Sequence, residues 1–388
     1  MSIYFDNAST TFLNKKVYLY IKKILKNKIY NPSSLYSRGL KYKFLIEKTK
    51  ILISKYLNIS SNEIFFTSSG TESNNFIIYI SIFFLNIKYI ITTKMEHNSL
   101  LKIINFFNFK KKIKCIYLKN NKKGDINYYE LENYINKYNK KKILVSLMHV
   151  NNEIGNIYDI NLIIKICKKY NNVFLHSDII QSIGYLNINI KKLDFATISL
   201  HKIHGPLGLG IVYKNKNIFL KKGFIMGGNQ ENNLRSGTEN IYSILSSKII
   251  FKDIYFKKKS RYRNIFLFKK YFIKKLLINI KNIKFNGNSS NLDKSINTIL
   301  NIRLPIKNNL LLFLMDKYYK TFISYGSSCD KINNENIYSH VLSNILSFKN
   351  LHKYTSIRLS FNYLNTKKEI DNFIIFLKEI LYKNIYNY

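Results

Sequence analysis

Three groups of side chains in the middle of the sequence have the types and the placement needed to hold a carbonyl cofactor. Lys202 follows the β-rich run FATISLH, and Asp178 ends the earlier run NVFLHSD. Gly70 and Thr71 open a helical pattern directly after the run EIFFTSS. A cofactor with an aldehyde, a pyridine nitrogen and a phosphate needs an amine for a Schiff base, a carboxylate beside the nitrogen, and an anion site. Lys202 is the candidate amine and Asp178 the candidate carboxylate. The Gly70–Thr71 turn with Ser199 is the candidate anion site.

The Gly70–Thr71 turn is a weak signal when it stands alone. A helix N-terminus presents unpaired N–H groups and a partial positive charge, which suits a phosphate. Ser and Thr also cap ordinary helices, so the same segment is typical of a helix start without any ligand. A single lysine is likewise most often a solvated charge. Lys202 stands out because it precedes a Gly/Pro turn in SLHKIHGP.

A further candidate is Cys329, which lies in the small-residue, polar segment ISYGSSCDKINN. Cys115 and Cys167 lie instead in apolar runs, where a buried thiol behaves as a small hydrophobic group. A cysteine beside Gly326 and two serines favours an exposed loop, where the thiolate is a nucleophile. The three cysteines have no CxxC spacing, so the sequence predicts neither a disulfide framework nor an intrinsic metal site.

The candidate residues need a scaffold that brings strand ends together, and the sequence predicts one. From about residue 60, short β-rich runs alternate with longer amphipathic stretches. This alternation predicts an α/β fold with a mostly parallel central sheet and helices on both faces, and such sheets bind ligands at the carboxyl ends of their strands. A lysine-rich helical pattern over residues 251–272 predicts a connector to a smaller α+β domain.

The composition excludes several classes of protein. The chain has 388 residues, enough for two domains, and its 46% hydrophobic content excludes a disordered protein. The longest apolar run, residues 76–85, is far shorter than the roughly 20 residues of a membrane span. The N-terminus has no signal-peptide pattern. We therefore expect a cytoplasmic protein without a membrane partner, or an organelle-matrix protein if a leader has been removed.

The net charge of +41 raises the alternative of a basic nucleic-acid-binding protein. The lysines are spread along the whole chain, however, and no basic arm or nucleic-acid-binding motif accompanies them. The bias toward Ile, Asn, Lys, Tyr and Phe resembles translation of an AT-rich genome. We therefore expect no specific nucleic-acid binding, and this class stays open as an alternative.

Ten segments in chain order resemble the NifS/IscS-type cysteine desulfurases, which are aspartate-aminotransferase-like (fold type I) pyridoxal-phosphate enzymes. The segments are YFDNASTT, NPSSLYSRG, FTSSGTESNN, MEHNSL, MHVNNEIG, HSDIIQS, SLHKIHGPLGLG, LRSGTEN, SYGSSCD and SIRLSF. The resemblance implies pyridoxal 5'-phosphate as cofactor, L-cysteine as substrate and a homodimer. It also implies a sulfur acceptor, either an iron–sulfur scaffold protein or a protein of tRNA thiolation. The expected division is a large cofactor-binding domain, residues 13–258, and a small α+β domain, residues 1–12 with 259–388.

The resemblance also implies a role for each candidate residue. Lys202 matches the Schiff-base lysine, and Cys329 matches the nucleophile that receives sulfur as a persulfide. His97 matches the imidazole that stacks on the cofactor ring, and it is the candidate acceptor of the substrate's thiol proton. Asp178 matches the partner of the ring nitrogen, and Gln181 matches the residue near the ring hydroxyl.

Other matches concern the phosphate of the cofactor and the carboxylate of the substrate. The phosphate site is matched by Gly70, Thr71, Ser199 and His201, while Thr238 would reach the phosphate bound by the neighbouring subunit. Asn152, which also lies beside the cofactor in the family, and Arg358 match positions that hold the substrate carboxylate, a task suited to the planar fork of arginine.

Selenocysteine lyase shares nearly all these residues and stays an open alternative, as does another fold type I pyridoxal-phosphate activity such as an aminotransferase. Cys329 argues against an aminotransferase, which needs no loop thiol. Three segments depart from the family pattern: SYGSSC replaces SSGSAC, GGNQE at residues 227–231 replaces a run of three glycines before a glutamine or histidine, and Leu200 replaces the glycine of SGHK. The chain ends at Tyr388, so we expect it to lack much of the tail on which a scaffold protein docks.

Overall fold

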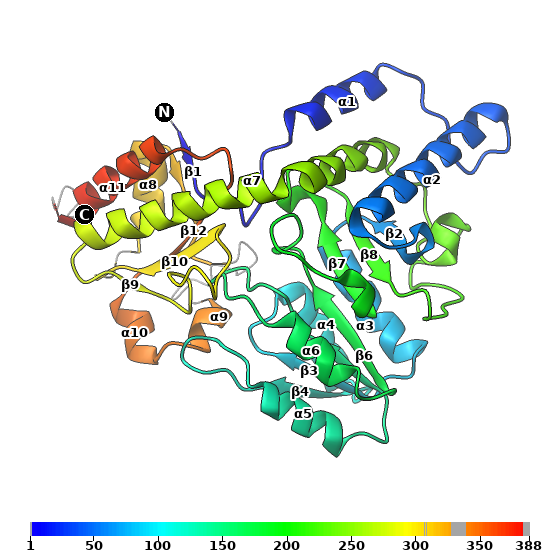
Figure 1. Cartoon of the computed structure of the whole chain (residues 1–388), viewed down its shortest axis with the longest axis horizontal. Helices are drawn as coiled ribbons and strands as arrows, with labels where there is room; N and C mark the ends of the chain where they lie inside the picture. Colours follow the sequence, from blue (N-terminus) through cyan, green and yellow to red (C-terminus); the bar gives the residue numbers. More distant parts are fainter. Residues whose placement is uncertain (1, 306, 308, 327–338, 383–388) are drawn as a thin grey trace.

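In the computed structural model, residues 2–305, 307, 309–326 and 339–382 are described. A large central sheet lies on one side of the molecule and a smaller set of strands on the other, and one long helix runs along both (Figure 1). Among the described residues, no helix is long and apolar enough to cross a lipid bilayer.

Seven strands form the central sheet, in the order β2-β8-β7-β6-β5-β3-β4. Their bounds are β2 (Ile64–Thr67), β3 (Tyr89–Thr93), β4 (Lys114–Leu118), β5 (Ile143–Ser146), β6 (Val173–Asp178), β7 (Phe195–Ser199) and β8 (Gly210–Lys214). Strands β7, β6, β5, β3 and β4 pair in parallel, whereas β8 is antiparallel to both of its neighbours. The expectation of a mostly parallel sheet is confirmed.

Helices cover both faces of this sheet. They are α1 (Lys15–Leu25), α2 (Ser37–Leu57), α3 (Gly70–Phe83), α4 (Asn98–Phe109), α5 (Tyr128–Lys137), α6 (Ile160–Cys167) and the first half of α7 (Ile241–Asn279). Successive residues of a strand point to opposite faces. Accordingly, Phe66 and Val145 pack in one core with α2, α6 and α7, whereas their neighbours Phe65 and Leu144 pack against α3 and α4. Burial on both faces explains why these strands are continuously apolar.

The smaller set of strands has a core of its own. The antiparallel sheet β12-β10-β9 consists of β9 (Lys284–Phe285), β10 (Ile299–Arg303) and β12 (Ser356–Ser360), and β1 (Ile3–Tyr4) pairs with β11 (Thr321–Phe322). The accompanying helices are α8 (Leu311–Tyr319), α9 (His340–Ser343), α10 (Phe348–Lys353) and α11 (Lys367–Tyr382). Because β1 pairs with β11, the first residues of the chain join the last third.

Helix α7 contributes to both cores. Leu245 and Phe251 pack beneath the central sheet, whereas Phe268 and Phe272 pack against β10, β12 and α11. The connector expected over residues 251–272 lies inside this helix, which begins ten residues earlier at Ile241. The two separate cores support the division near residue 258, which we keep as a proposal.

Lys269 is a charged residue in the second core. It is fully buried in α7, and its Nζ donates to Ser295 Oγ (2.7 Å) and to the Ile296 carbonyl (2.8 Å). No carboxylate pairs with it among the described residues, and burial lowers its pKa to about 7. In the unfolded chain, a lysine keeps its proton until a pH of about 10. The unfolded state therefore binds more protons between pH 7 and 10, so the free energy of unfolding rises with pH across this window.

We expect Lys269→Met to remove this dependence. Denaturant unfolding between pH 7.5 and 9.5 measures this dependence. The free energy of unfolding of the wild type, relative to that of the variant, should rise by up to about 1.4 kcal/mol per pH unit. The neighbouring exposed lysine provides the control, because Lys270→Met should keep the wild-type slope. Equal slopes for the wild type and Lys269→Met would contradict the assignment.

Candidate active site

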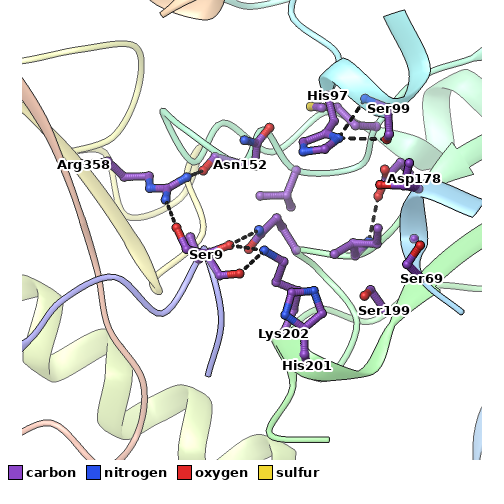
Figure 2. A pocket seen from close by; sticks show the side chains of 17 residues that line it. Ser9, Ser69, His97, Ser99, Asn152, Asp178, Ser199, His201, Lys202 and Arg358 are labelled. Atoms are coloured by element: carbon purple, nitrogen blue, oxygen red, sulfur yellow. Dashed lines mark hydrogen bonds between the residues drawn. The ribbon is translucent and has the colours of Figure 1, made fainter. Parts of the chain in front are cut away.

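A cavity of about 270 Å³ lies at the carboxyl ends of β6 and β7, where the sequence predicts the site (Figure 2). The predicted site residues that line it are Gly70, Thr71, His97, Asn152, Asp178, Gln181, Ser199, His201, Lys202 and Arg358. The parallel strands place the ends of β6 and β7 side by side, while Arg358 comes from β12 of the other sheet. The cavity therefore lies where the two sets of strands meet.

Lys202 reaches the cavity from a short turn, Leu200–Lys202, directly after β7. Its Nζ donates to the carbonyls of Ala8 (2.7 Å) and Ser9 (2.5 Å). The Ala8 carbonyl also accepts from Gln181 Nε2 at 3.1 Å. The amine thus faces neutral carbonyl groups inside the cavity, and the N-terminal segment supplies them.

Asp178 ends β6 with its carboxylate buried at the cavity wall. Its two oxygens accept from Asn74 Nδ2 and from the Ile180 N–H, each at 3.0 Å. Burial raises the pKa of Asp178, and these hydrogen bonds and the nearby Lys202 ammonium oppose that rise. A protonated ring nitrogen placed here would supply the positive charge that keeps such a carboxylate ionised.

His97 caps helix α4 with its ring. Its Nδ1 accepts from the Ser99 N–H at 3.1 Å and lies 2.8 Å from Ser99 Oγ. A backbone N–H can only donate, so in the neutral ring the proton belongs on Nε2. This arrangement favours a stacking and donating role for His97 over the role of thiol-proton acceptor at Nε2. Asn74 Nδ2 also donates to Ser99 Oγ (2.9 Å), so one amide links the supports of His97 and Asp178.

The first turn of α3 and the end of β7 form a polar corner of the cavity. Ser69 Oγ caps the helix by accepting from the Glu72 N–H at 3.1 Å, as an ordinary N-cap does. The N–H groups of Gly70 and Thr71 have no partner within the helix, because they belong to its first turn. A Cβ at position 70 would lie 2.4 Å from Ile180 Cδ1, so a larger residue there would require the Ile180 side chain to move.

His201 borders the same corner. Its Nδ1 lies 3.2 Å from Thr10 Oγ1, and burial together with the adjacent Lys202 lowers the pKa of His201 to about 4. The ring is therefore neutral at pH 7 and offers a hydrogen bond to an anion rather than a charge. With the N–H groups of α3 and the hydroxyl of Ser199, the corner has the donors that a phosphate needs.

Arg358 and Asn152 form the opposite wall. Arg358 is 1% exposed, and its Nη1 donates to the Asn152 carbonyl at 3.0 Å. Among the described residues, Arg358 Nε and Asn152 Oδ1 are buried and have no hydrogen-bond partner. Buried polar atoms normally have partners, so these two atoms indicate a wall that takes a polar ligand.

Two predicted residues do not line this cavity in the described structure. Thr238 is exposed, in the loop that precedes α7. Cys329 lies outside the described residues. Gly326 and Ser339, the nearest described residues before and after Cys329, lie close together: a Cβ built on Gly326 would lie 3.1 Å from Ser339 Cβ. Ser339 Oγ donates to the Glu153 carboxylate, next to Asn152.

Four supporting residues had no role assigned from the sequence. Asn74 and Ser99 hold Asp178 and His97, and Asp6 and Ser9 contact Arg358. All four lie in segments that resemble the family, but nothing local marks them as partners. Among the described residues, no group of three or more His, Cys, Asp or Glu side chains could hold a metal ion.

Comparison with known proteins decides the family. The Aminotransferase class-V profile matches residues 3–373. A protein described as Cysteine desulfurase IscS from Dictyoglomus turgidum is 34% identical over 386 residues, which cover 98% of this chain and 95% of that protein. The chain belongs to the class-V aminotransferases and, within them, to the NifS/IscS-type cysteine desulfurases. This family depends on pyridoxal phosphate.

Solved structures agree with this assignment. A structure described as a NifS-like protein has a TM-score of 0.87 at 29% identity, and the match covers 98% of this chain and 99% of that one. A structure described as SspA in complex with cysteine has a TM-score of 0.77 at 25% identity, covering 94% of this chain and 100% of that one. The expected fold type I architecture of the cysteine desulfurase family is therefore confirmed.

Proposed function

We propose that the protein is a cysteine desulfurase that uses pyridoxal 5'-phosphate to convert L-cysteine into L-alanine. The sulfur atom leaves the substrate's β-carbon and joins Cys329 Sγ as a persulfide. One C–S bond breaks and one S–S bond forms, so the sulfur is oxidised while the carbon is reduced to a methyl group. The observation that carries this proposal is the convergence of Lys202, Asp178 and Arg358 on one cavity (Figure 2).

Residues of the described cavity fit the cofactor. Lys202 would hold its aldehyde, Asp178 would face its ring nitrogen, and Gln181 would lie near its ring hydroxyl. The first turn of α3 with Ser199 and His201 would hold its phosphate. When bound, the cofactor supplies an electron sink for the substrate's α-carbon. Asp178 maintains that sink by keeping a positive charge at the ring nitrogen.

Other residues bind the substrate and move its protons. Arg358 and Asn152 bind the carboxylate of L-cysteine at the wall opposite the phosphate corner. His97 would stack on the ring and would donate a hydrogen bond from Nε2. Lys202 Nζ would accept the α-proton of the substrate, since a neutral amine at that point is a suitable general base.

The described chain that leads to Cys329 lies beside the strand that carries Arg358. Gly326 follows Ser324, whose backbone pairs with that of Arg358 (N to O, 2.6 Å from Arg358 to Ser324). The segment before Cys329 and the arginine that would bind the substrate carboxylate therefore meet at one place.

We also propose a homodimer, because Thr238, which the resemblance assigns to the phosphate of the neighbouring subunit, is exposed and does not line the cavity of its own chain. Large apolar side chains are exposed before α1, between α1 and α2, on α2, and between β8 and α7: Phe12, Leu35, Phe44, Phe219 and Met226. A second copy would cover such residues. The sulfur acceptor would be an iron–sulfur scaffold protein or a protein of tRNA thiolation.

Anaerobic incubation of the cofactor-loaded protein with L-cysteine tests the proposal. We expect alanine, and we expect none when a 2-oxo acid replaces L-cysteine. Release of selenide from L-selenocysteine at a much higher kcat/KM would favour selenocysteine lyase instead. An aminated oxo acid, formed from L-cysteine and an added oxo acid, would favour an aminotransferase. A protein that binds RNA in a salt-sensitive way and takes up no cofactor would contradict the enzyme assignment.

A further inference from the structure

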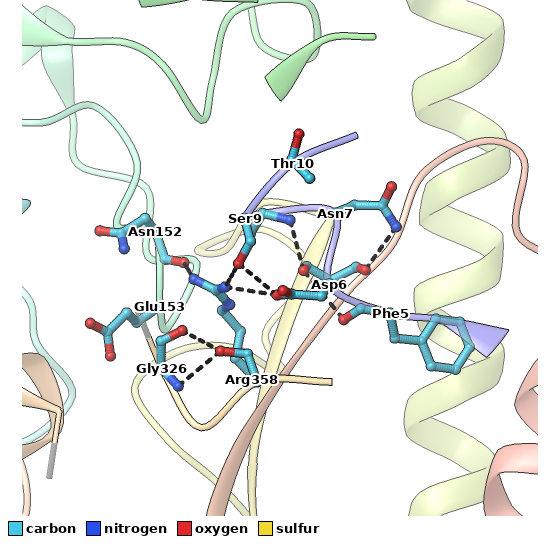
Figure 3. A network of polar contacts seen from close by, with 12 residues as sticks. Phe5, Asp6, Asn7, Ser9, Thr10, Asn152, Glu153, Gly326 and Arg358 are labelled. Atoms are coloured by element: carbon cyan, nitrogen blue, oxygen red, sulfur yellow. Dashed lines mark hydrogen bonds and ion pairs between the residues drawn. The ribbon is translucent and has the colours of Figure 1, made fainter. Parts of the chain in front are cut away.

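We propose that Asp6 is a positioning residue for the substrate carboxylate, because it fixes the orientation of the Arg358 guanidinium (Figure 3). The inference rests on the proposed function, in which Arg358 receives the carboxylate of L-cysteine. Asp6 lies 352 residues from Arg358 in the chain, in the turn that follows β1.

Asp6, Ser9 and Arg358 form a closed triangle of hydrogen bonds (Figure 3). Asp6 Oδ1 accepts from Arg358 Nη2 at 2.9 Å and from Ser9 Oγ at 2.8 Å. Arg358 Nη2 uses its second N–H toward Ser9 Oγ at 2.7 Å. Nη2 is thus saturated, and the ligand must use the N–H groups that remain on Nη1 and Nε.

Another contact fixes the far edge of the same fork. Nη1 donates one N–H to the Asn152 carbonyl. The guanidinium is therefore hydrogen-bonded both to the N-terminal turn and to the loop after β5. Its side chain is 2% exposed, which leaves little room for rotation. A planar fork held at both Nη1 and Nη2 cannot rotate freely, so its remaining N–H groups keep fixed directions.

The turn that contains Asp6 also touches the amine site. Asn7 N–H and Ala8 N–H donate to the carbonyl (3.1 Å) and hydroxyl (2.8 Å) of Ser360, on the strand that carries Arg358. The carbonyls of Ala8 and Ser9 receive Lys202 Nζ. One short turn therefore holds the carboxylate-binding arginine and the amine-bearing lysine at a set separation.

Charge alone predicts the opposite effect for Asp6. Its carboxylate would repel the carboxylate of L-cysteine, so removing it should tighten binding if it did nothing else. Asp6 is 20% exposed and paired with Arg358, so solvent and the guanidinium weaken that repulsion. We expect the loss of orientation to dominate. Without Asp6, the Arg358 guanidinium would lose conformational entropy each time it is ordered by a bound carboxylate, and this loss weakens binding.

The test compares Asp6→Ala and Asp6→Asn with a matched control, Asp253→Ala, in the cofactor-loaded protein. Asp253 pairs with Arg261 at 2.5 Å on α7 and does not line the cavity, so its loss breaks a comparable ion pair elsewhere. The readouts are KM and kcat for L-cysteine, the Kd for L-alanine from the cofactor's absorption, the Kd for cysteamine, which lacks a carboxylate, and Tm.

We expect Asp6→Ala to raise the KM for L-cysteine and the Kd for L-alanine by roughly 10- to 100-fold, with kcat within about threefold of wild type. The Kd for cysteamine should not change. Asp6→Asn keeps an oxygen that accepts from Nη2, so its effect should be smaller, roughly threefold. Asp253→Ala should match the wild type in every binding constant.

Unchanged or tighter binding of L-alanine by Asp6→Ala would overturn the inference, and so would an equal loss of affinity for cysteamine. If Asp6→Ala fails to fold, the same comparison made with Asp6→Asn decides the question. If the wild type forms no alanine from L-cysteine, the proposed function fails. The Kd for L-alanine still tests the positioning role of Asp6 in that case, because binding of an amino acid does not require desulfuration.

Discussion

Cys329→Ser is expected to lower alanine formation from L-cysteine by roughly 10³-fold or more, while the protein keeps its full content of cofactor. A serine hydroxyl stays protonated at neutral pH, whereas a thiol is partly ionised and its thiolate attacks sulfur readily. The steady-state rate of alanine formation under anaerobic conditions measures the effect, and the cofactor's absorption shows that the cavity is intact.

Cys115 provides the matched control for that substitution. Burial raises the pKa of Cys115 to about 11 and that of Cys167 to about 12, so both thiols stay protonated at neutral pH. Cys115→Ser should therefore keep the wild-type rate. Persulfide formation by Cys329→Ser at the wild-type rate would remove Cys329 from the mechanism.

Lys202→Ala is expected to abolish both the covalent link to the cofactor and turnover. The variant should lose the visible absorption band that a lysine-linked cofactor gives, and alanine formation should fall by roughly 10³-fold or more. The reason is that Lys202 both holds the aldehyde and moves the α-proton. Absorption spectra and turnover, measured on protein loaded with excess cofactor, test this result.

A surface lysine at the other end of β7 serves as control. Lys192 is exposed in the turn before β7, so Lys192→Ala should have wild-type absorption and rate. A Lys202→Ala protein with the wild-type absorption band would show that the cofactor is held elsewhere, and the roles assigned to Asp178 and Arg358 would then lose their basis.

Strand ends explain why much of the cavity could be predicted from the sequence. Asp178 and Lys202 each follow a short apolar run, and parallel strands bring such ends to one edge of a sheet. Strands β6 and β7 pair in parallel and place both residues at one cavity. The family resemblance extended this prediction to residues without a periodic signal, such as Arg358 and Gln181, which also line the cavity.

The supporting contacts could not be predicted, because they join segments far apart in the chain. Asn74 meets Asp178 across 104 residues, and Asp6 meets Arg358 across 352 residues. Hydrophobic periodicity describes which face of one element is buried, but it does not specify which polar side chain of another element will satisfy a buried donor. The antiparallel direction of β8 has a similar origin, since it depends on the turn after Lys202 rather than on the strand itself.

The most direct test of the central claim is a single turnover with less L-cysteine than enzyme, carried out without oxygen. Alanine is quantified, and the mass of the peptide that contains Cys329 is measured in the same sample. The account predicts one added sulfur atom on that peptide for each alanine formed, with the peptides of Cys115 and Cys167 unmodified. Alanine formed with all of the sulfur released as free sulfide, or carried by Cys115 or Cys167, would contradict it.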